Sequence, residues 1–389
     1  MSRNTNSANT LGDPPVSVGV FGASGTTGTE IVALLVGHPA IELVFATSRR
    51  SAGHSLRSVD PAAPDVPLIH PDEVDLTGVS AVFICLPHGK AAATAKQAHD
   101  AGVLVIDLSG DLRLHDPEVH DAVYGSPRDE ELAAAAVYGL TELSRDDIAR
   151  TRIVSNPGCY PTCTGLALAP LARRGWLAGP VHVDAKSGVS GAGRTPTEHN
   201  HFCAVSDDIR PYALGRSHRH VAEIDQLLAS LVPEGIAAPE LIFCPHVVPL
   251  ERGMLATIFV TLPPERTALQ VWEALREDYR DEAFVDVLPL GDAARIRGVV
   301  RTNRACIGVH PVPGSSQVVL TSAIDNILKG AAGQALQNFN LVMGFDESAG
   351  LEHYGGRRPA PPTRPAPPTL SDVVEWPSSA QGFGSGPRP

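Results

Sequence analysis

Short apolar runs alternate with helical stretches through the first half of the chain. The apolar runs VSVGVF, IELVFAT, AVFICL and VLVIDL each have the length of a buried strand. A helical pattern over Thr27–Val36 separates the first two runs, and an Ala-rich helical stretch follows the third. Because parallel strands need crossover helices, this alternation predicts a Rossmann-like, doubly wound parallel sheet of the α/β class.

The pattern changes after Pro170. Longer β-rich segments, PVHVDAKSGVS, LIFCPHVVPL and LATIFVTL, accompany helical patterns over Val221–Leu231 and Ala268–Tyr279, which predicts a second, α+β domain. A strand, QVVLTSAI, then precedes a helix predicted over Asn326–Met343, long enough to dock on the first domain. We therefore expect a discontinuous first domain of residues 16–156 and 326–350, and a second domain of residues 157–325.

Both ends of the chain differ in composition from the region between them. Residues 1–15 are rich in Asn, Ser, Thr and Pro, and we expect a disordered lead. Residues 354–389 are rich in Pro, Gly and Arg, which predicts an extended or disordered tail. That tail could be a linker, an interaction segment or a segment without a role.

Length and charge narrow the classes of partner. The 389 residues suffice for two domains with a cleft between them. A net charge of −12, with acidic residues spread along the chain, argues against nucleic-acid or anionic membrane partners. No apolar run approaches the ~20 residues that span a bilayer, and no signal-peptide pattern opens the chain. We therefore expect a cytoplasmic protein that binds small molecules.

A glycine-rich turn follows the first predicted strand and precedes a helix. It reads Gly22, Ala23, Ser24, Gly25, Thr26, Thr27, Gly28. Glycines at such a turn let backbone N–H groups approach a pyrophosphate, which the helix N-terminus also attracts. After the second strand, where an NAD site would carry an acidic residue, the chain has Thr47, Ser48, Arg49 and Arg50, which favours the 2′-phosphate of NADP(H). The alternatives are a turn without a ligand and a solvated basic loop.

Cys159 is the cysteine whose setting predicts reactivity. The six cysteines are scattered and do not form a disulfide framework. Cys159 follows the strand and turn IVSNPG, just ahead of a helix expected to open at Pro161, where the helix dipole would lower the pKa of the thiol. Cys85 and Cys163 fit small, buried apolar roles. Zinc held by Cys159 and Cys163 would need a second close pair of ligands, so no metal is predicted.

Two further loops carry candidate acid/base and anion-binding groups. The loop GRSHRH offers His218 or His220 as the base, and residues two apart normally diverge, so one of them should face Cys159. Glycine-rich KSGVSGAGR adds backbone N–H groups to cationic side chains, as a phosphate site requires, although a mobile surface loop is the alternative. The candidate anion-binding residues are Lys186, Ser190, Arg194, Arg216 and Arg219.

Motifs along most of the chain carry a resemblance to a known family. They are FGASGTTG, LPHGKA, DLSGDLRL, VYGL, SNPGCYPT, KSGVSGAGR, HRHVAEI and IDNILKGAAGQALQN. From Val16 to about Asp346 the chain resembles the N-acetyl-gamma-glutamyl-phosphate reductases, the arginine-biosynthesis members of the semialdehyde dehydrogenase superfamily. Three features depart from that pattern: Cys163 stands where Ala or Gly is usual, Ala222 replaces a frequent Pro, and the Pro-rich tail is extra.

The resemblance implies a role for each motif. Cys159 would be the nucleophile and His220 or His218 the acid/base, with His220 favoured. The residues expected at the NADP(H) site are Gly22, Ser24, Gly25, Thr26, Thr27, Gly28, Ser48, Arg49, Pro87, His88, Ser187, Gly188 and Asn326. The residues expected to bind substrate are Asn156, Lys186, Ser190, Arg194, Arg216 and Arg219.

The resemblance also implies a reaction and an assembly. A Cys159 thiolate would attack an acyl phosphate, phosphate would leave, and NADPH would reduce the thioester to a semialdehyde. The small-molecule partners are then the acyl phosphate and phosphate, and the β-rich second domain could join the chain into a homodimer or homotetramer. The rival functions are a sister enzyme acting on aspartyl phosphate or a carrier-bound aminoadipyl phosphate, an NADP-binding regulatory protein and a zinc-dependent hydrolase.

Overall fold

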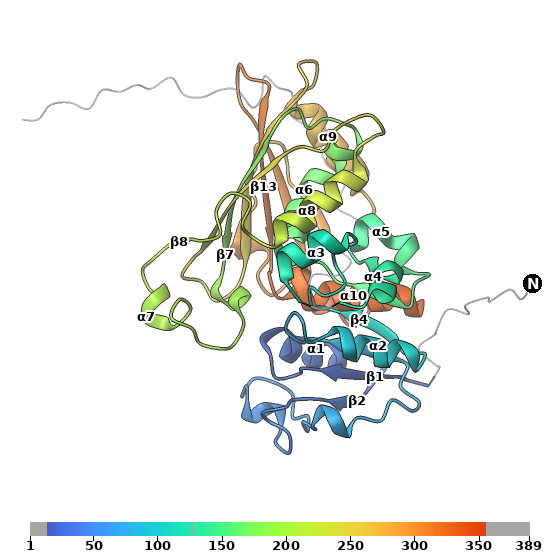
Figure 1. The fold of residues 1–389 in the computed structure, drawn as a ribbon. Helices are drawn as coiled ribbons and strands as arrows, with labels where there is room; N and C mark the ends of the chain where they lie inside the picture. Colours follow the sequence, from blue (N-terminus) through green and yellow to red (C-terminus); the bar gives the residue numbers. More distant parts are fainter. Residues whose placement is uncertain (1–13, 127, 355–389) are drawn as a thin grey trace, which may run out of the picture.

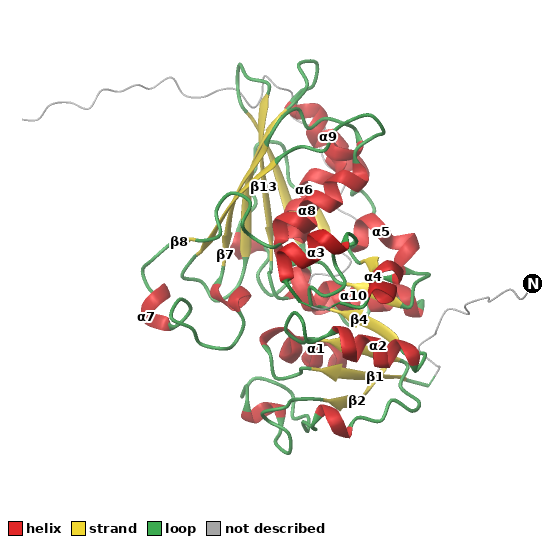
Figure 2. Cartoon of the chain, viewed as in Figure 1, coloured by secondary structure: helices red, strands yellow, loops and turns green. Residues whose placement is uncertain are grey.

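A computed structural model of the 389-residue chain describes residues 14–126 and 128–354 (Figure 1). The expected disordered lead and Pro-rich tail, apart from their innermost residues, lie outside the described residues. The described chain forms two sheets, each with its own helices (Figure 2). None of its helices combines the length and the apolar content that crossing a membrane requires.

The first sheet is parallel and lies between two layers of helices. Its strand order is β2-β1-β3-β4-β6-β5. The strands are β1 (Val16–Phe21), β2 (Ile41–Ala46), β3 (Ala81–Ile84), β4 (Leu104–Asp107), β5 (Val137–Tyr138) and β6 (Ile153–Ser155). Helices α1 (Thr26–Gly37) and α10 (Gly333–Met343) join the core on one face, whereas α2 (Ala92–Asp100) and α4 (Glu130–Ala135) cover the other. The predicted Rossmann-like fold class is therefore confirmed.

The second sheet is mixed and carries helices on one face. Its strand order is β11-β12-β13-β10-β7-β9-β8. The strands are β7 (Val181–Ser187), β8 (Arg210–Pro211), β9 (Leu241–Val247), β10 (Met254–Thr261), β11 (Val285–Val287), β12 (Ala305–Pro311) and β13 (Gln317–Ile324). Helices α6 (Cys159–Arg173), α8 (His220–Leu231) and α9 (Ala268–Asp278) pack on that face in the largest apolar cluster. This is the predicted α+β second domain.

Three short helices complete the fold around these two layers. Helices α3 (Pro117–Tyr124) and α5 (Thr141–Ile148) lie between the domains, and α7 (Phe202–Val205) sits on an arm that projects from the second domain (Figure 1). The arm connects the glycine-rich segment after β7 to the edge strand β8.

The last helix differs from its prediction at its start. A single helix was expected from Asn326, but the chain makes a π-helical turn over Leu328–Ala332 before α10 begins at Gly333. The buried carboxylate of Asp325 accepts hydrogen bonds from the N–H groups of Ile327 and Leu328, and it thereby starts the turn. Side chains of α10 join the core of the first sheet, which supports our proposal of a discontinuous first domain.

Candidate active site

Cys159 is the first residue of α6, directly after the turn that follows β6. We expected the helix to open at Pro161, and that start was wrong by two residues. Gly158 is the N-cap in extended conformation, and a proline within the first turn is tolerated because the N–H groups there have no intrahelical partner. Cys159 as a whole is half-buried.

Burial of the Cys159 thiol opposes a preformed thiolate. The sequence predicted a lowered pKa, but burial raises the pKa of Cys159 to about 11, outweighing the opposite effects of Arg113 and the Tyr160 N–H. A free thiol with this pKa is protonated at neutral pH. The chemistry therefore requires a base beside Cys159.

His220 is in position to be that base. A Cβ atom on Gly158 would lie 2.6 Å from His220 Nε2, so the imidazole covers the residue before Cys159. Burial lowers the pKa of His220 well below 6.5, and the nearby charges of His218 and Arg113 lower it further. A neutral imidazole at this place can accept a proton from the thiol.

His218 packs against His220 and does not point away from it, so the expected divergence was wrong. Their ring centroids are 4.8 Å apart, and His218 Nδ1 accepts a hydrogen bond from the backbone N–H of His220. The His218 ring also contacts Tyr160, Tyr212 and Phe243 edge-on. Burial, followed by the charge of Arg219, lowers the pKa of His218 to about 4. The contact of His220 with Gly158 favours His220 as the base.

Glu223 is the central buried carboxylate of the site, and sequence reasoning missed it. It is 0 % exposed and lies one helical turn after His220, whose Nε2 is 3.7 Å from Glu223 Oε1. Its other oxygen accepts hydrogen bonds from the Gly158 N–H (3.0 Å) and the Tyr138 hydroxyl (3.1 Å). The spacing of His and Glu in HRHVAEI, three residues apart on a helix, was the available signal.

Arg113 is the second group that the sequence did not assign. Its guanidinium is buried and donates to Glu223 Oε1 (3.1 Å), to the Asn156 carbonyl (2.9 Å) and to the Leu108 carbonyl (2.9 Å). This arginine comes from the DLSGDLRL motif of the first domain. It therefore ties the first domain both to α8 and to the turn that carries Cys159.

The sequence predicted Asn156 as a substrate ligand, but in the structure its side chain is buried and bonded to the protein. It is 1 % exposed, its Nδ2 donates to the Ala331 carbonyl and its Oδ1 accepts from Asn338. Both ends of the amide are thus used to hold the nucleophile turn against the π-helical turn and α10.

The glycine-rich turn between β1 and α1 has the shape of a pyrophosphate cradle. Gly22 has φ +80°, and a Cβ atom on Gly28 would lie 2.2 Å from the Gly22 carbonyl oxygen, so side chains are excluded at both positions. The N-cap Gly25 offers no side chain to cap α1, and Thr26 and Thr27 open the helix without an acidic neighbour in its first turn. These residues fit an anionic cofactor.

The end of β2 lies beside this turn. Ser48 is buried, and its Oγ is 2.8 Å from Oγ of Ser24 in the glycine-rich turn. Arg49 is largely exposed, with a loose ion pair of 3.7 Å to Asp72. Its guanidinium can therefore turn toward a 2′-phosphate next to Ser48.

The LPHG loop is held in place by a second acidic residue, Asp111. Its carboxylate accepts hydrogen bonds from the N–H groups of Gly89, Ala91 and Ala92, and Nδ1 of His88 accepts one from Gly110. Burial lowers the pKa of His88 to about 3. The His88 ring lies 5.1 Å from the ring of Tyr124, whose hydroxyl donates to Glu223 at 3.4 Å, so His88 lies next to the buried groups around Cys159.

The predicted nicotinamide residues of the second domain meet in one packed loop. Ser187 is buried, Gly188 donates its N–H to the Gly253 carbonyl, and Ser190 Oγ accepts from Asn326 Nδ2. Asn326 Oδ1 accepts from the Gly253 N–H at 2.6 Å. Asn326 therefore holds these loops together with its amide.

Two predicted substrate residues make contacts with groups other than those around Cys159. Lys186 Nζ donates to Asp184 Oδ2 at 2.5 Å. Side chains alternate along a strand, and Ala185 belongs to the core on the helix side of the sheet, so Lys186 lies on the opposite face. Arg194 contacts the first domain, donating to the Val59 carbonyl and to Asp60. In this structure both side chains are thus engaged by other groups, and their roles as substrate ligands stay predictions.

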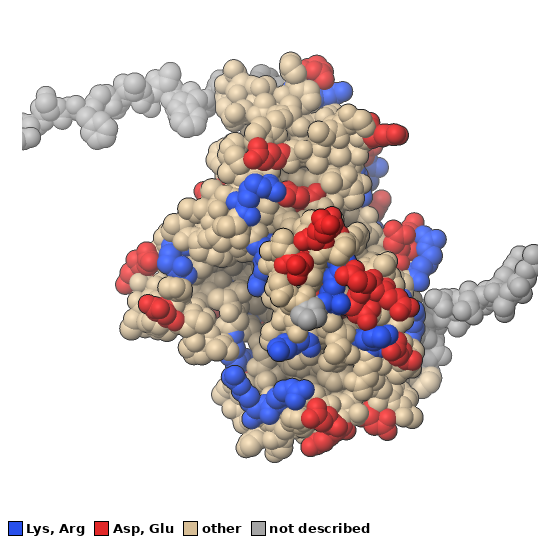
Figure 3. Space-filling view, in the orientation of Figure 1, with Lys and Arg blue, Asp and Glu red and all other residues tan. Residues whose placement is uncertain are grey.

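A cavity of about 780 Å³ adjoins the histidine loop. It lies between α3 and the start of α8, and its lining includes Arg216, His218 and Arg219. Arg216 is ion-paired with Asp225, whereas Arg219 is exposed and makes no hydrogen bond or ion pair with the described part of the chain. Basic side chains also surround the hollow where the two domains meet (Figure 3).

Two family models divide the chain at the nucleophile. Residues 17–151 match the semialdehyde dehydrogenase NAD binding domain, and residues 159–326 match the semialdehyde dehydrogenase dimerisation domain. The chain is 41 % identical over 346 residues to the N-acetyl-gamma-glutamyl-phosphate reductase of Desulforapulum autotrophicum, with 88 % of this chain and 99 % of that protein aligned. The chain belongs to the N-acetyl-gamma-glutamyl-phosphate reductase family. The Rhodospirillum rubrum member is 42 % identical, with 87 % and 97 % covered.

Solved structures similar to this N-acetyl-gamma-glutamyl-phosphate reductase family member show the same fold. Aspartate semialdehyde dehydrogenase II of Vibrio cholerae has a TM-score of 0.66 at 19 % identity, covering 85 % of this chain and 98 % of that one. The Candida albicans aspartate semialdehyde dehydrogenase with NADP has a TM-score of 0.63 at 17 % identity, covering 85 % and 99 %. At this identity the likeness concerns the fold alone.

Proposed function

We propose that the chain reduces N-acetyl-glutamyl 5-phosphate with NADPH to N-acetyl-glutamate 5-semialdehyde and phosphate, through a thioester on Cys159. The observation that carries the proposal is Cys159 at the start of α6 beside His220 and Glu223. The membership of the chain in the N-acetyl-gamma-glutamyl-phosphate reductase family identifies the substrate.

Proton transfer within the site accounts for a nucleophile with a raised pKa. As the sulfur of Cys159 attacks the acyl carbon, its proton passes to neutral His220, the acyl carbon–oxygen bond breaks and phosphate leaves. The charge of Glu223 stabilises the resulting imidazolium. The N–H of Cys159, the first residue of α6 and without an intrahelical partner, is our candidate donor to the oxyanion of the tetrahedral intermediate.

The cofactor, when bound, supplies the hydride that reduces the thioester carbon. Residues of this chain would orient it: the glycine-rich turn would hold the pyrophosphate, Ser48 and Arg49 the 2′-phosphate, and His88 with Ser187 the nicotinamide end. The proton that His220 removed from Cys159 returns to the sulfur when the aldehyde departs. The thiol and the imidazole are then restored for the next turnover.

Arg219 is the residue that we propose for binding the leaving phosphate or the substrate carboxylate. Its guanidinium is exposed beside the cavity and lowers the pKa of both His218 and Cys159. Arg216 lines the same cavity. Ser190, on the loop after β7, stays a candidate substrate ligand. This arrangement keeps Arg216 and Arg219 of the ligands expected from the sequence, whereas Lys186 and Arg194 pair with Asp184 and Asp60.

A homodimer is the assembly that we propose. The family model over residues 159–326 describes a dimerisation domain. The second sheet has helices on one face, and Phe259 of β10 stands 41 % exposed on the other. The cytoplasmic location expected from the sequence stays a prediction.

A reverse assay tests the proposed reaction. Phosphate-dependent NADP⁺ reduction is expected with N-acetyl-glutamate semialdehyde and not with aspartate semialdehyde. Mass spectrometry after brief exposure to N-acetyl-glutamyl phosphate without NADPH should show an acyl adduct on Cys159. Cys159→Ser should lose turnover, whereas Cys203→Ser, a change at an exposed cysteine, should not. Turnover retained by Cys159→Ser would exclude the thioester route.

A further inference from the structure

Two arginines of the second domain contact the beginning of α1 in the first domain. Arg252 donates to Glu30 Oε2 at 3.0 Å, and Arg194 approaches Thr29 Oγ1 at 3.4 Å. Thr29 and Glu30 directly follow Gly28 of the glycine-rich turn, and Thr29 Oγ1 donates to the Ala23 carbonyl within that turn. The segment that would hold the cofactor pyrophosphate is therefore attached to the second domain.

Besides Glu30 of α1, Arg252 contacts a residue next to the segment that packs on the nucleophile. Its side chain is 7 % exposed, and it pairs with the fully buried Asp325 at 3.1 Å. Asp325 starts the π-helical turn through the N–H groups of Ile327 and Leu328. Within that turn, a Cβ atom on Gly330 would lie 2.8 Å from Cβ of Cys159. Direct contacts thus run from α1 through Arg252 and Asp325 to Cys159.

The backbone beside Arg252 also carries the loop expected at the nicotinamide. Ser190 donates its N–H to the Glu251 carbonyl, and Gly188 donates to the Gly253 carbonyl. A Cβ atom on Gly188 would lie 2.9 Å from the Arg252 nitrogen, so the two loops pack without space for a side chain. Any shift of Arg252 relative to α1 would move this loop with respect to the cofactor turn.

We propose that Arg252 is a positioning residue, which sets the cofactor against Cys159 through its paired contacts with Glu30 and Asp325. This inference rests on the proposed function, because it concerns the geometry of hydride transfer to the Cys159 thioester. Orientation of reacting groups contributes strongly to rate, and a displacement of about 1 Å can cost about 10²-fold. Thiol acylation needs no cofactor, so it should not depend on the Arg252–Glu30 contact.

The test removes the interdomain contact and leaves the rest of the network in place. Glu30→Met deletes the acceptor on α1 while Arg252 keeps Asp325, whereas Glu30→Gln retains an acceptor and serves as the conservative rescue. Arg301→Met is the matched control, because Arg301 pairs with exposed Glu251 within the second domain. The readouts are NADP⁺ protection of Cys159 against iodoacetamide, acyl-adduct formation without NADPH, and turnover.

Glu30→Met should lower turnover by up to about 10²-fold and weaken NADP⁺ protection, with acyl-adduct formation unchanged. Glu30→Gln should recover most of both losses, and Arg301→Met should match the wild type. Wild-type protection and turnover in Glu30→Met would overturn the inference, as would a parallel loss of acylation and turnover. A wild-type enzyme that forms no adduct would refute the proposed function instead, while the protection readout would still report on the contact.

Discussion

At the scale of single residues, the nucleophile relies on its neighbours to remove its proton. Burial raises the pKa of Cys159 to about 11 and lowers the pKa of His220 well below 6.5. Both shifts favour the neutral pair of thiol and imidazole over the ion pair. The resting enzyme should therefore be protected from adventitious oxidation, since the thiolate is the reactive species.

The pH dependence of Cys159 alkylation tests this assignment. The thiolate fraction of a group with a pKa of about 11 rises tenfold per pH unit throughout the neutral and mildly alkaline range. Iodoacetamide labelling in a Cys203→Ser background should therefore keep rising up to pH 9.5 or so. A plateau near neutral pH would instead show a preformed thiolate.

Glu223 should matter for stability as well as for catalysis. It accepts hydrogen bonds from Gly158 and Tyr138 and pairs with buried Arg113. In Glu223→Gln the guanidinium loses its buried counter-charge, which costs about 3–5 kcal/mol of unfolding free energy. Urea denaturation measures the change, with exposed Glu273→Gln on α9 as the control. An equal stability of the two variants would contradict the role of the buried charge.

At the scale of elements, local pattern predicted α8 and α9 to within one residue at each end. Their apolar periodicity is itself the property that makes them pack on the second sheet. The starts of α6 and α10 could not be found in this way. Glu223, 65 residues further along the chain, accepts the N–H of the N-cap Gly158 before α6. Asp325, which tertiary packing buries, accepts the N–H groups of Ile327 and Leu328 and so places a π-helical turn ahead of α10.

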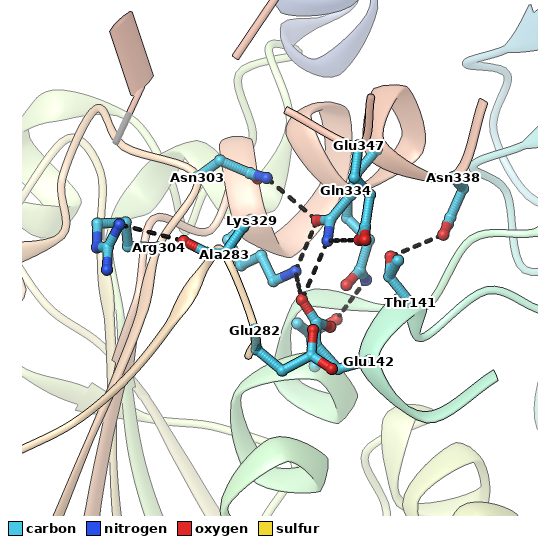
Figure 4. A network of polar contacts seen from close by, with 12 residues as sticks. Thr141, Glu142, Glu282, Ala283, Asn303, Arg304, Lys329, Gln334, Asn338 and Glu347 are labelled. Atoms are coloured by element: carbon cyan, nitrogen blue, oxygen red, sulfur yellow. Dashed lines mark hydrogen bonds and ion pairs between the residues drawn. The ribbon is translucent and has the colours of Figure 1, made fainter. Parts of the chain in front are cut away.

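The π-helical turn is also held by a buried ion pair. Lys329 Nζ donates to Glu142 Oε1 of α5 at 2.5 Å, and both side chains are 0 % exposed. Figure 4 shows this pair among polar side chains of α10 and the residues after it. The Gln337 amide of α10 accepts from Lys329 Nζ at 2.8 Å and donates to Glu142 at 3.2 Å and to Glu347 at 3.0 Å. The network joins α5 to the segment that contacts Cys159.

Removing one member of this pair should destabilise the protein strongly. Lys329→Met leaves the Glu142 carboxylate buried without its cation, and we expect a loss of about 3–5 kcal/mol in denaturant unfolding. The double variant Lys329→Met, Glu142→Gln should recover much of that loss, because no uncompensated charge remains. If the loss in the double variant equals the sum of the losses in Lys329→Met alone and Glu142→Gln alone, the two residues do not interact.

At the scale of the whole molecule, the sequence predicted two domains and the site between them, because each motif ends or begins a strand or helix. The glycine-rich turn, the nucleophile turn and the histidine loop each precede a helix in the fold, as their local sequence predicted. The contacts of Lys186 and Arg194 could not be predicted. Their charges suited a phosphate, but the sheet face of Lys186 and the Asp60 partner of Arg194 are set by tertiary structure.

Phe259 and Phe202 each mark a possible surface for assembly into a dimer. Phe259 is 41 % exposed on the open sheet face, in register with Val319 and His182 on the neighbouring strands, whereas Phe202 is 80 % exposed on the projecting arm. A stable homodimer needs about 800 Å² of buried surface on each partner, which a broad sheet face can supply. We therefore expect the dimer to form through the sheet.

Replacing each phenylalanine in turn by a charged residue tests this choice of interface. Phe259→Glu should shift the protein from dimer to monomer in sedimentation velocity experiments, because a carboxylate would be desolvated at the centre of the interface. Phe202→Glu makes the same chemical change on the arm and should leave the dimer intact. Dissociation by Phe202→Glu alone would place the interface on the arm. Circular dichroism of both variants would show whether the fold itself is retained, since neither side chain belongs to an apolar core cluster.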